Sequence, residues 1–129
     1  MENKKDDLVM YVLVPYNLSP IQQGIQAAHA IAELSLNCNI LKVGSITVME
    51  STKYTEWVKE HKTIVILNAG TTGKDSTMSK HLKNLDLLDI NYATFNEPDL
   101  NDALTAIAFI VNKKEDTPII EYLQSMGLA

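Results

Sequence analysis

A buried strand followed directly by a capped helix is the feature that most limits how this chain can fold. Leu8 to Val14 reads LVMYVLV, an apolar run without alternation that is typical of a strand covered on both faces. Ser19 then stands at a helix N-cap, with Pro20 at the first helical position and Gln22 three residues after the cap. This opening pair of elements favours an α/β fold.

Strands and helices continue to alternate along the chain. We predict further strands at 62–67, 90–95 and 104–111, helices at 20–36, 52–61, 75–88 and 117–126, and either a short strand or an irregular connection at 46–49. The order predicts a single three-layer α/β domain, with a mixed, mostly parallel four-stranded sheet and helices on both faces. We expect residues 1–7 to form a flexible tail, residues 8–112 the domain and residues 113–129 its C-terminal helix.

The composition favours a cytoplasmic protein without a membrane partner. A chain of 129 residues is long enough for one hydrophobic core. Its apolar runs stay far below the roughly 20 residues that cross a bilayer, and the charged residues 1–7 do not resemble a secretory signal. The single cysteine, Cys38, has no partner for an intrachain disulfide, which fits a reducing compartment.

The charged residues argue against a general nucleic-acid binder. The 11 basic residues are all lysine, and they are outnumbered by 16 acidic residues. Arginine is the preferred bidentate phosphate ligand, and none is present. The alternative remains that a local patch of lysines binds nucleic acid although the rest of the chain is acidic.

Two stripes run along the predicted helix 20–36. The apolar stripe, expected to face the sheet, consists of Ile21, Ile25, Ala28 and Ala32. The polar stripe consists of Gln22, Gln26, His29 and Glu33. A solvated helix face and a face on which His29 orients a substrate or shuttles a proton both fit this polar pattern. The spacing alone leaves that choice open.

Other candidate motifs are weaker. The loop AGTTGKDS, Ala69–Ser76, departs from the phosphate-binding loop at Asn68 and Asp75, which favours a turn and a helix cap. The spacing of Cys38 and the histidines matches no zinc site, so no metal and no cofactor is expected. Three carboxylates lie between the last two strands, where they could form a turn or act as general bases or metal ligands: Glu97, Asp99 and Asp102.

The segment Leu18–Ala30 resembles the signature of type II peptidyl-tRNA hydrolases. That signature reads approximately M-S-x-G-K-x-A-A-Q-x-x-H-A and likewise follows an N-terminal strand; the matching positions are Ser19, Gln26, His29 and Ala30. Thr105–Ala108 resembles the closing strand of the family, T-V-L-A. The resemblance spans roughly Leu8–Val111 and implies the fold of this family.

The resemblance implies hydrolysis of the ester that joins a peptide to tRNA. It places catalytic roles on Gln22, His29, Glu97 and Thr105, and substrate-binding roles on Ser19, Gln26 and Asp99. It also implies tRNA or peptidyl-tRNA as partner, and self-association as a homodimer.

Two departures from the family pattern fall on its catalytic residues. The family lysine falls on Gln22, and the family turn D-A-G-R-T-Q is replaced by Asn96–Asn101, with Glu97 in place of the catalytic aspartate. The alternative function is therefore a catalytically inactive binding module of the same fold, which recognises tRNA, a nucleotide or a protein.

Overall fold

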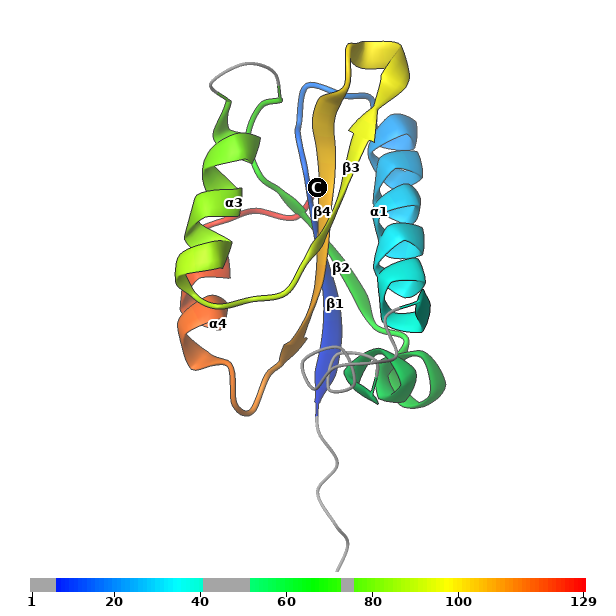
Figure 1. Cartoon of the computed structure of the whole chain (residues 1–129). Coiled ribbons are helices and arrows are strands. Elements are labelled where there is room, and N and C mark those ends of the chain that lie inside the picture. Colours follow the sequence, from blue (N-terminus) through cyan, green and yellow to red (C-terminus); the bar gives the residue numbers. More distant parts are fainter. Residues whose placement is uncertain (1–6, 41–51, 73–75) are drawn as a thin grey trace, which may run out of the picture.

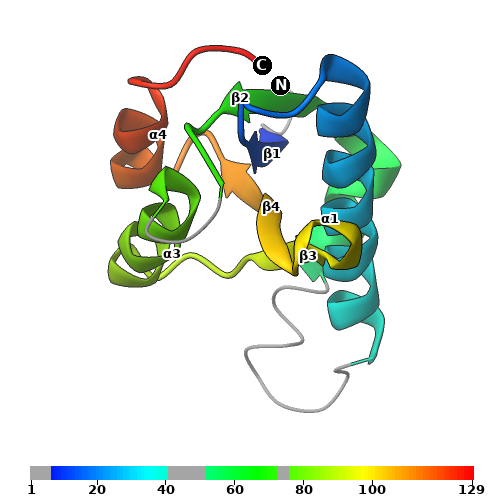
Figure 2. The same cartoon turned by 90° about the horizontal axis from the view of Figure 1, so that it is seen from above.

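One sheet lies between two layers of helices in the computed structural model, which describes residues 7–40, 52–72 and 76–129 (Figure 1). Helix α1 covers one face, and α3 and α4 cover the other, as the view from above also shows (Figure 2). These helices span Pro20–Ile40 (α1), Thr77–Leu87 (α3) and Thr117–Leu123 (α4). The expected α/β architecture with helices on both faces of a mixed four-stranded sheet is confirmed.

The sheet has the strand order β2-β1-β4-β3. Its strands span Leu8–Val14 (β1), Ile64–Asn68 (β2), Ala93–Glu97 (β3) and Ala103–Asn112 (β4). Only β1 and β2 pair in parallel, while β4 runs antiparallel to both β1 and β3. The expectation of a mostly parallel sheet is therefore wrong. The connection from Pro98 to Asp102 is too short for a crossover, and short connections join antiparallel strands.

The two central strands, β1 and β4, are those whose sequences are continuous apolar runs. Strand β1 has the predicted bounds, and β4 is buried along almost its whole length. The edge strand β2 starts two residues later than predicted, because Lys62 adopts a left-handed conformation (φ 60°) that ends the preceding helical turn. Strand β3 starts at Ala93 rather than at residue 90. The predicted element at 46–49 lies outside the described residues.

Helix α1 is both longer than predicted and rotated relative to the prediction. We expected Asn37–Asn39 to end it near Leu36, but it continues to Ile40 because Leu34 and Cys38 are buried against the sheet. The apolar stripe does not face the sheet: Ile21 is 76% exposed and Ile25 is 42% exposed. The buried face is formed instead by Gln26, Ala27, Ala30, Leu34 and Cys38.

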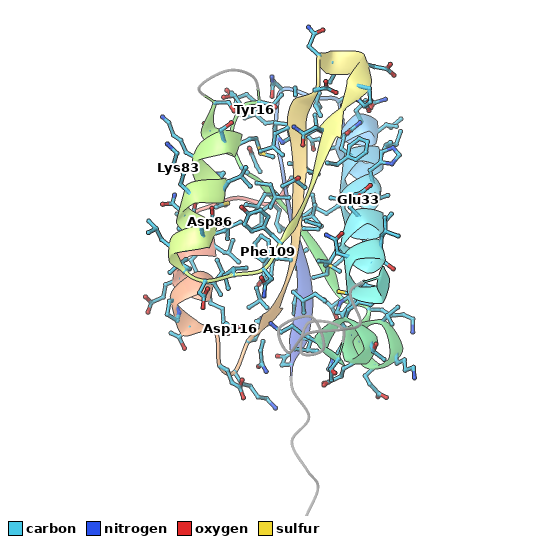
Figure 3. All side chains as sticks on the ribbon, in the orientation of Figure 1. Tyr16, Glu33, Lys83, Asp86, Phe109 and Asp116 are labelled. Carbon is cyan, nitrogen blue, oxygen red and sulfur yellow. The ribbon has the colours of Figure 1, made fainter. Side chains whose placement is uncertain are left out.

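On the opposite face of the sheet, α3 and α4 cover a second apolar cluster. Phe109 of β4 lies at its centre, between the sheet and the two helices (Figure 3). As the loop pattern predicts, Ser76 caps α3, with its Oγ accepting a hydrogen bond from the Ser79 N–H at 3.4 Å. Gly70 has φ +104°, and a Cβ there would lie 2.5 Å from the Cβ of Thr77, so only glycine fits.

A buried hydrogen-bond chain fastens α4 to this layer. The Nε2 of His81 is 2.9 Å from the carbonyl oxygen of Ala69, which requires a hydrogen on Nε2. The Nδ1 of His81 therefore accepts from the Tyr122 hydroxyl, whose oxygen in turn accepts from Asn84 at 3.0 Å. This chain needs His81 to be neutral, and burial lowers its pKa below the ordinary 6.5.

We predict that this chain makes folding sensitive to mild acid. The unfolded chain takes up a proton at His81 near pH 6.5, and the folded chain only at lower pH. The resulting stability is present at neutral pH and is lost as pH falls below about 6.5. The free energy of unfolding, measured with urea at about pH 7.5 and at about pH 5.5, should fall less in His81→Gln than in the wild type. An equal fall in both proteins would contradict this role of His81.

Candidate active site

A buried carboxamide organises the site. Gln26 projects from α1 toward β3 and β4 and is 1% exposed. Its Nε2 donates to Oε1 of Glu97 at 2.7 Å and to Oε1 of Gln22 at 3.4 Å, and its own Oε1 accepts from the Thr105 hydroxyl at 2.5 Å. Each polar atom of this buried amide thus has a partner, as a buried polar group requires.

Thr105 fixes which way the amide of Gln26 points. It lies on β4, is 0% exposed, and also has its hydroxyl 3.3 Å from the carbonyl oxygen of Phe95. Because the hydroxyl donates to the oxygen of Gln26, the nitrogen of Gln26 is directed to Glu97. Thr105 therefore acts through Gln26 and has no surface of its own at which to touch a substrate.

Glu97 ends β3 and is held from two sides. Its Oε1 accepts from Gln26, and its Oε2 accepts from the backbone N–H of Asp99 at 3.2 Å. The hydrogen bond from Gln26 is the main cause that holds the pKa of Glu97 below the ordinary 4.5; the Asp99 N–H and the proximity of His29 add to it. At neutral pH Glu97 is therefore a fixed anion: a good hydrogen-bond acceptor, but a weak base.

His29 lies on α1 close to Glu97. Its imidazole stacks on Phe95 of β3, with the ring centroids 4.4 Å apart and an interplanar angle of 17°. The ring is exposed to solvent on its outer side. Sequence analysis does not place Phe95 in the site, because a half-buried aromatic residue on an alternating strand is ordinary.

Gln22 and Ser19 lie at the N-terminal end of α1. The Oγ of Ser19 accepts from the backbone N–H of Gln22 at 3.2 Å, which confirms the predicted cap. The side-chain oxygen of Gln22 accepts from Gln26 instead of reaching back to the cap. Gln22 is exposed, and among the described residues no partner is seen for its Nε2, so two N–H donors remain for a ligand.

Most of the residues singled out in the sequence meet at one end of the molecule. The β3–β4 turn lies beside the first half of α1 there (Figures 1 and 2). Hydrogen bonds join the side chains of Gln22, Gln26, Glu97 and Thr105, and His29 lies close enough to Glu97 to lower its pKa. Asp99 contributes its backbone N–H, Ser19 caps the helix, and Glu33 stays on the exposed side of α1 (Figure 3).

Asp102 belongs to the turn. It adopts a left-handed conformation (φ 58°), as aspartate tolerates, and its N–H donates to the carbonyl oxygen of Glu97 at 2.9 Å. In the ranges described, no group of three or more His, Cys, Asp or Glu side chains is placed to hold a metal ion. Nor does any helix in those ranges have the length and apolarity to cross a membrane.

Comparison with protein-family models and with curated proteins found no match to the chain.

We predict that Gln26 sets the acidity of Glu97. The Glu97 carboxyl should titrate below 4.5 in the wild type and shift upward in Gln26→Met, because its shortest hydrogen bond is lost. Carbon-13 NMR of the carboxyl carbon over a pH series measures this directly. Gln22→Met is the matched control: the same exchange one helical turn away, at a residue without a hydrogen bond to Glu97. Equal titration of Glu97 in the wild type and Gln26→Met would rule the role out.

Proposed function

We propose that this chain hydrolyses the ester that joins a peptide or an amino acid to tRNA, with Gln22, His29 and Glu97 forming the reacting surface. The observation that carries the proposal is the hydrogen-bonded set of Thr105, Gln26 and Glu97, which fixes a carboxylate beside His29. The resemblance of residues 18–30 to type II peptidyl-tRNA hydrolases supports the choice of substrate. The proposal places the protein in the cytoplasm, where charged tRNA is found.

The proposed reaction is attack of one water molecule on the ester carbonyl carbon. Glu97 accepts a hydrogen bond from this water and orients it, while His29 takes the proton that the water releases. The tetrahedral oxyanion accepts hydrogen bonds from the Nε2 of Gln22. Collapse breaks the bond to the ribose oxygen, which leaves with the proton from His29, so that free tRNA and a carboxylic acid result.

Gln26 and Thr105 position these groups without touching the substrate. Both side chains are buried, at 1% and 0% exposed. Gln26 keeps Glu97 ionised and directed, and Thr105 keeps Gln26 from turning its oxygen toward Glu97. If the carboxamide of Gln26 were rotated by half a turn, its oxygen would face the carboxylate oxygen of Glu97. The two oxygens would then repel each other, and the hydrogen bond would be lost.

Gln22 makes this a slow catalyst. A neutral amide stabilises an oxyanion less than an ammonium group does. Complete loss of one oxyanion donor costs about 2.7–4 kcal/mol, on the order of 100- to 1,000-fold in rate, and this is the upper limit of the penalty because Gln22 still donates. The same neutral residue, together with the absence of arginine, favours the second candidate function. In that case the fold binds tRNA, a nucleotide or a protein through the same surface, and no ester is cleaved.

Exchange of Gln22 for lysine tests the enzyme proposal. Deacylation of N-acetyl-aminoacyl-tRNA should be slow with the wild type and faster with Gln22→Lys, by at most about 100- to 1,000-fold, the effect of a whole oxyanion donor. Glu97→Gln should reduce the rate in both backgrounds, because the oriented anion is lost. Glu33→Gln, an exposed carboxylate on the same helix, is the matched control and should leave the rate unchanged. An inert wild type that gains nothing from Gln22→Lys refutes hydrolysis.

The alternative function, binding of tRNA without catalysis, is tested by titrating the protein with deacylated tRNA at several salt concentrations. Contacts to phosphates release counterions, so the binding constant should fall steeply as salt rises. Binding that does not depend on salt would contradict phosphate recognition. Salt-dependent binding without turnover, in both the wild type and Gln22→Lys, would identify the module rather than the enzyme.

A further inference from the structure

A cavity of about 250 Å³ opens between α4 and the β1–β2 half of the sheet. Figure 2 shows α4 over this half of the sheet, while α3 lies over the other half. The cavity is on the face opposite α1 and therefore does not belong to the candidate active site. Its walls are largely apolar and include Val65, Leu67, Ile120 and Leu123.

Three polar side chains border this apolar space: Tyr11, Lys113 and Gln124. Tyr11 is half-buried, and its ring stacks on Phe109 with the ring centroids 6.3 Å apart. In the part of the chain that the structure describes, no hydrogen-bond partner is seen for the Tyr11 hydroxyl, and no buried side-chain oxygen or nitrogen lacks a partner. The hydroxyl therefore reaches solvent and has a hydrogen bond left for a ligand.

Lys113 supplies a positive charge at the cavity. Its backbone N–H donates to the carbonyl oxygen of Asp7 at 2.8 Å, which fixes the start of the side chain just after β4 ends. Among the residues described, no ion pair or hydrogen bond of its ammonium group is seen. The carboxylate of Asp116 accepts from the backbone N–H of Asn112 at 2.8 Å instead. The side chain of Gln124, also exposed and without a partner among those residues, adds two N–H donors.

We propose that this cavity binds a small monocarboxylate with an apolar body, such as an arylacetic or a branched aliphatic acid. The ammonium group of Lys113 pairs with the carboxylate, and the Tyr11 hydroxyl and the Gln124 amide are further donors to its oxygens. The apolar walls cover the rest of the ligand, and removal of that surface from water drives binding. A volume of about 250 Å³ lies below the roughly 300–1,000 Å³ of sites for drug-sized ligands, which indicates a ligand of about ten non-hydrogen atoms.

Other classes of ligand fit the cavity less well. A nucleotide is too large for it, and its phosphates would need several donors where the walls are apolar. A cation would meet Lys113, and the lining residues include no carboxylate to hold it. A wholly apolar ligand would leave the three polar side chains without a role. The proposal depends on the α4 side of the sheet and not on the hydrolase proposal, so either can fail without the other.

A titration with phenylacetate, followed by NMR of the methyl groups, tests the site. The signals of Ile120 and Leu123 should shift saturably, with a dissociation constant on the order of millimolar, while those of Ile21 on α1 stay in place. Phenylacetamide has nearly the same shape without the charge and should bind at least about fivefold more weakly. The absence of saturable shifts up to about 50 mM overturns the proposal, as does equal binding of the acid and the amide.

Two lysine variants test the ion pair. Lys113→Met keeps an unbranched apolar stem and removes the charge, so it should weaken phenylacetate binding at least about fivefold and leave phenylacetamide binding unchanged. Lys113 is exposed, so the variant should fold as the wild type does. Lys83→Met is the matched control: Lys83 is exposed on α3 (Figure 3), and its exchange should not change binding. An equal loss in both variants, or no loss in Lys113→Met, overturns the proposal.

Discussion

Burial of a single uncharged amide determines how α1 sits on the sheet. Gln26 is 1% exposed, and an unsatisfied polar group at such a position costs about 1–3 kcal/mol. Full burial of an isoleucine side chain contributes about 1.5–3 kcal/mol, so the two effects are comparable. Thr105 and Glu97 satisfy the amide, which removes the penalty. The helix is then free to turn Gln26 inward and Ile21 and Ile25 outward.

Two consequences of this rotation reach the surface. On one flank, the amide of Gln26 holds Glu97 as an oriented anion next to His29, which is the geometry behind the proposed hydrolysis. On the outer side, Ile21 and Ile25 remain in water. The oriented carboxylate and the exposed isoleucines are thus two results of the same packing of α1, and a change at position 26 is expected to disturb both.

The sequence predicted the elements better than their faces. The strand Leu8–Val14 and the helix cap at Ser19 are each predicted from neighbouring residues alone, and the structure confirms both. The inward face of α1 was predicted wrongly because the helix carries two apolar stripes, and the buried one has the same helical spacing as the one that was chosen: Ala27, Ala30, Leu34 and Cys38. Periodicity does not show which stripe lies beside the partners of Gln26 on β3 and β4. Sheet direction was predicted wrongly for the same reason: it depends on which distant strand lies beside β1.

The site was found in part. Gln22, Gln26, His29, Glu97 and Thr105 were singled out by spacing and resemblance, and contacts join them in the fold. The burial of Thr105 and the stacking of His29 on Phe95 could not be predicted, since both depend on residues far apart in the chain.

The orientation of α1 on the sheet can be measured in solution through nuclear Overhauser effects. The side-chain amide protons of Gln26 should exchange slowly and show contacts to Thr105, while the methyl groups of Ile21 and Ile25 show none to the sheet. A rapidly exchanging Gln26 amide, together with methyl contacts from Ile25 to β1 or β4, would show that the apolar stripe faces inward and would contradict the account.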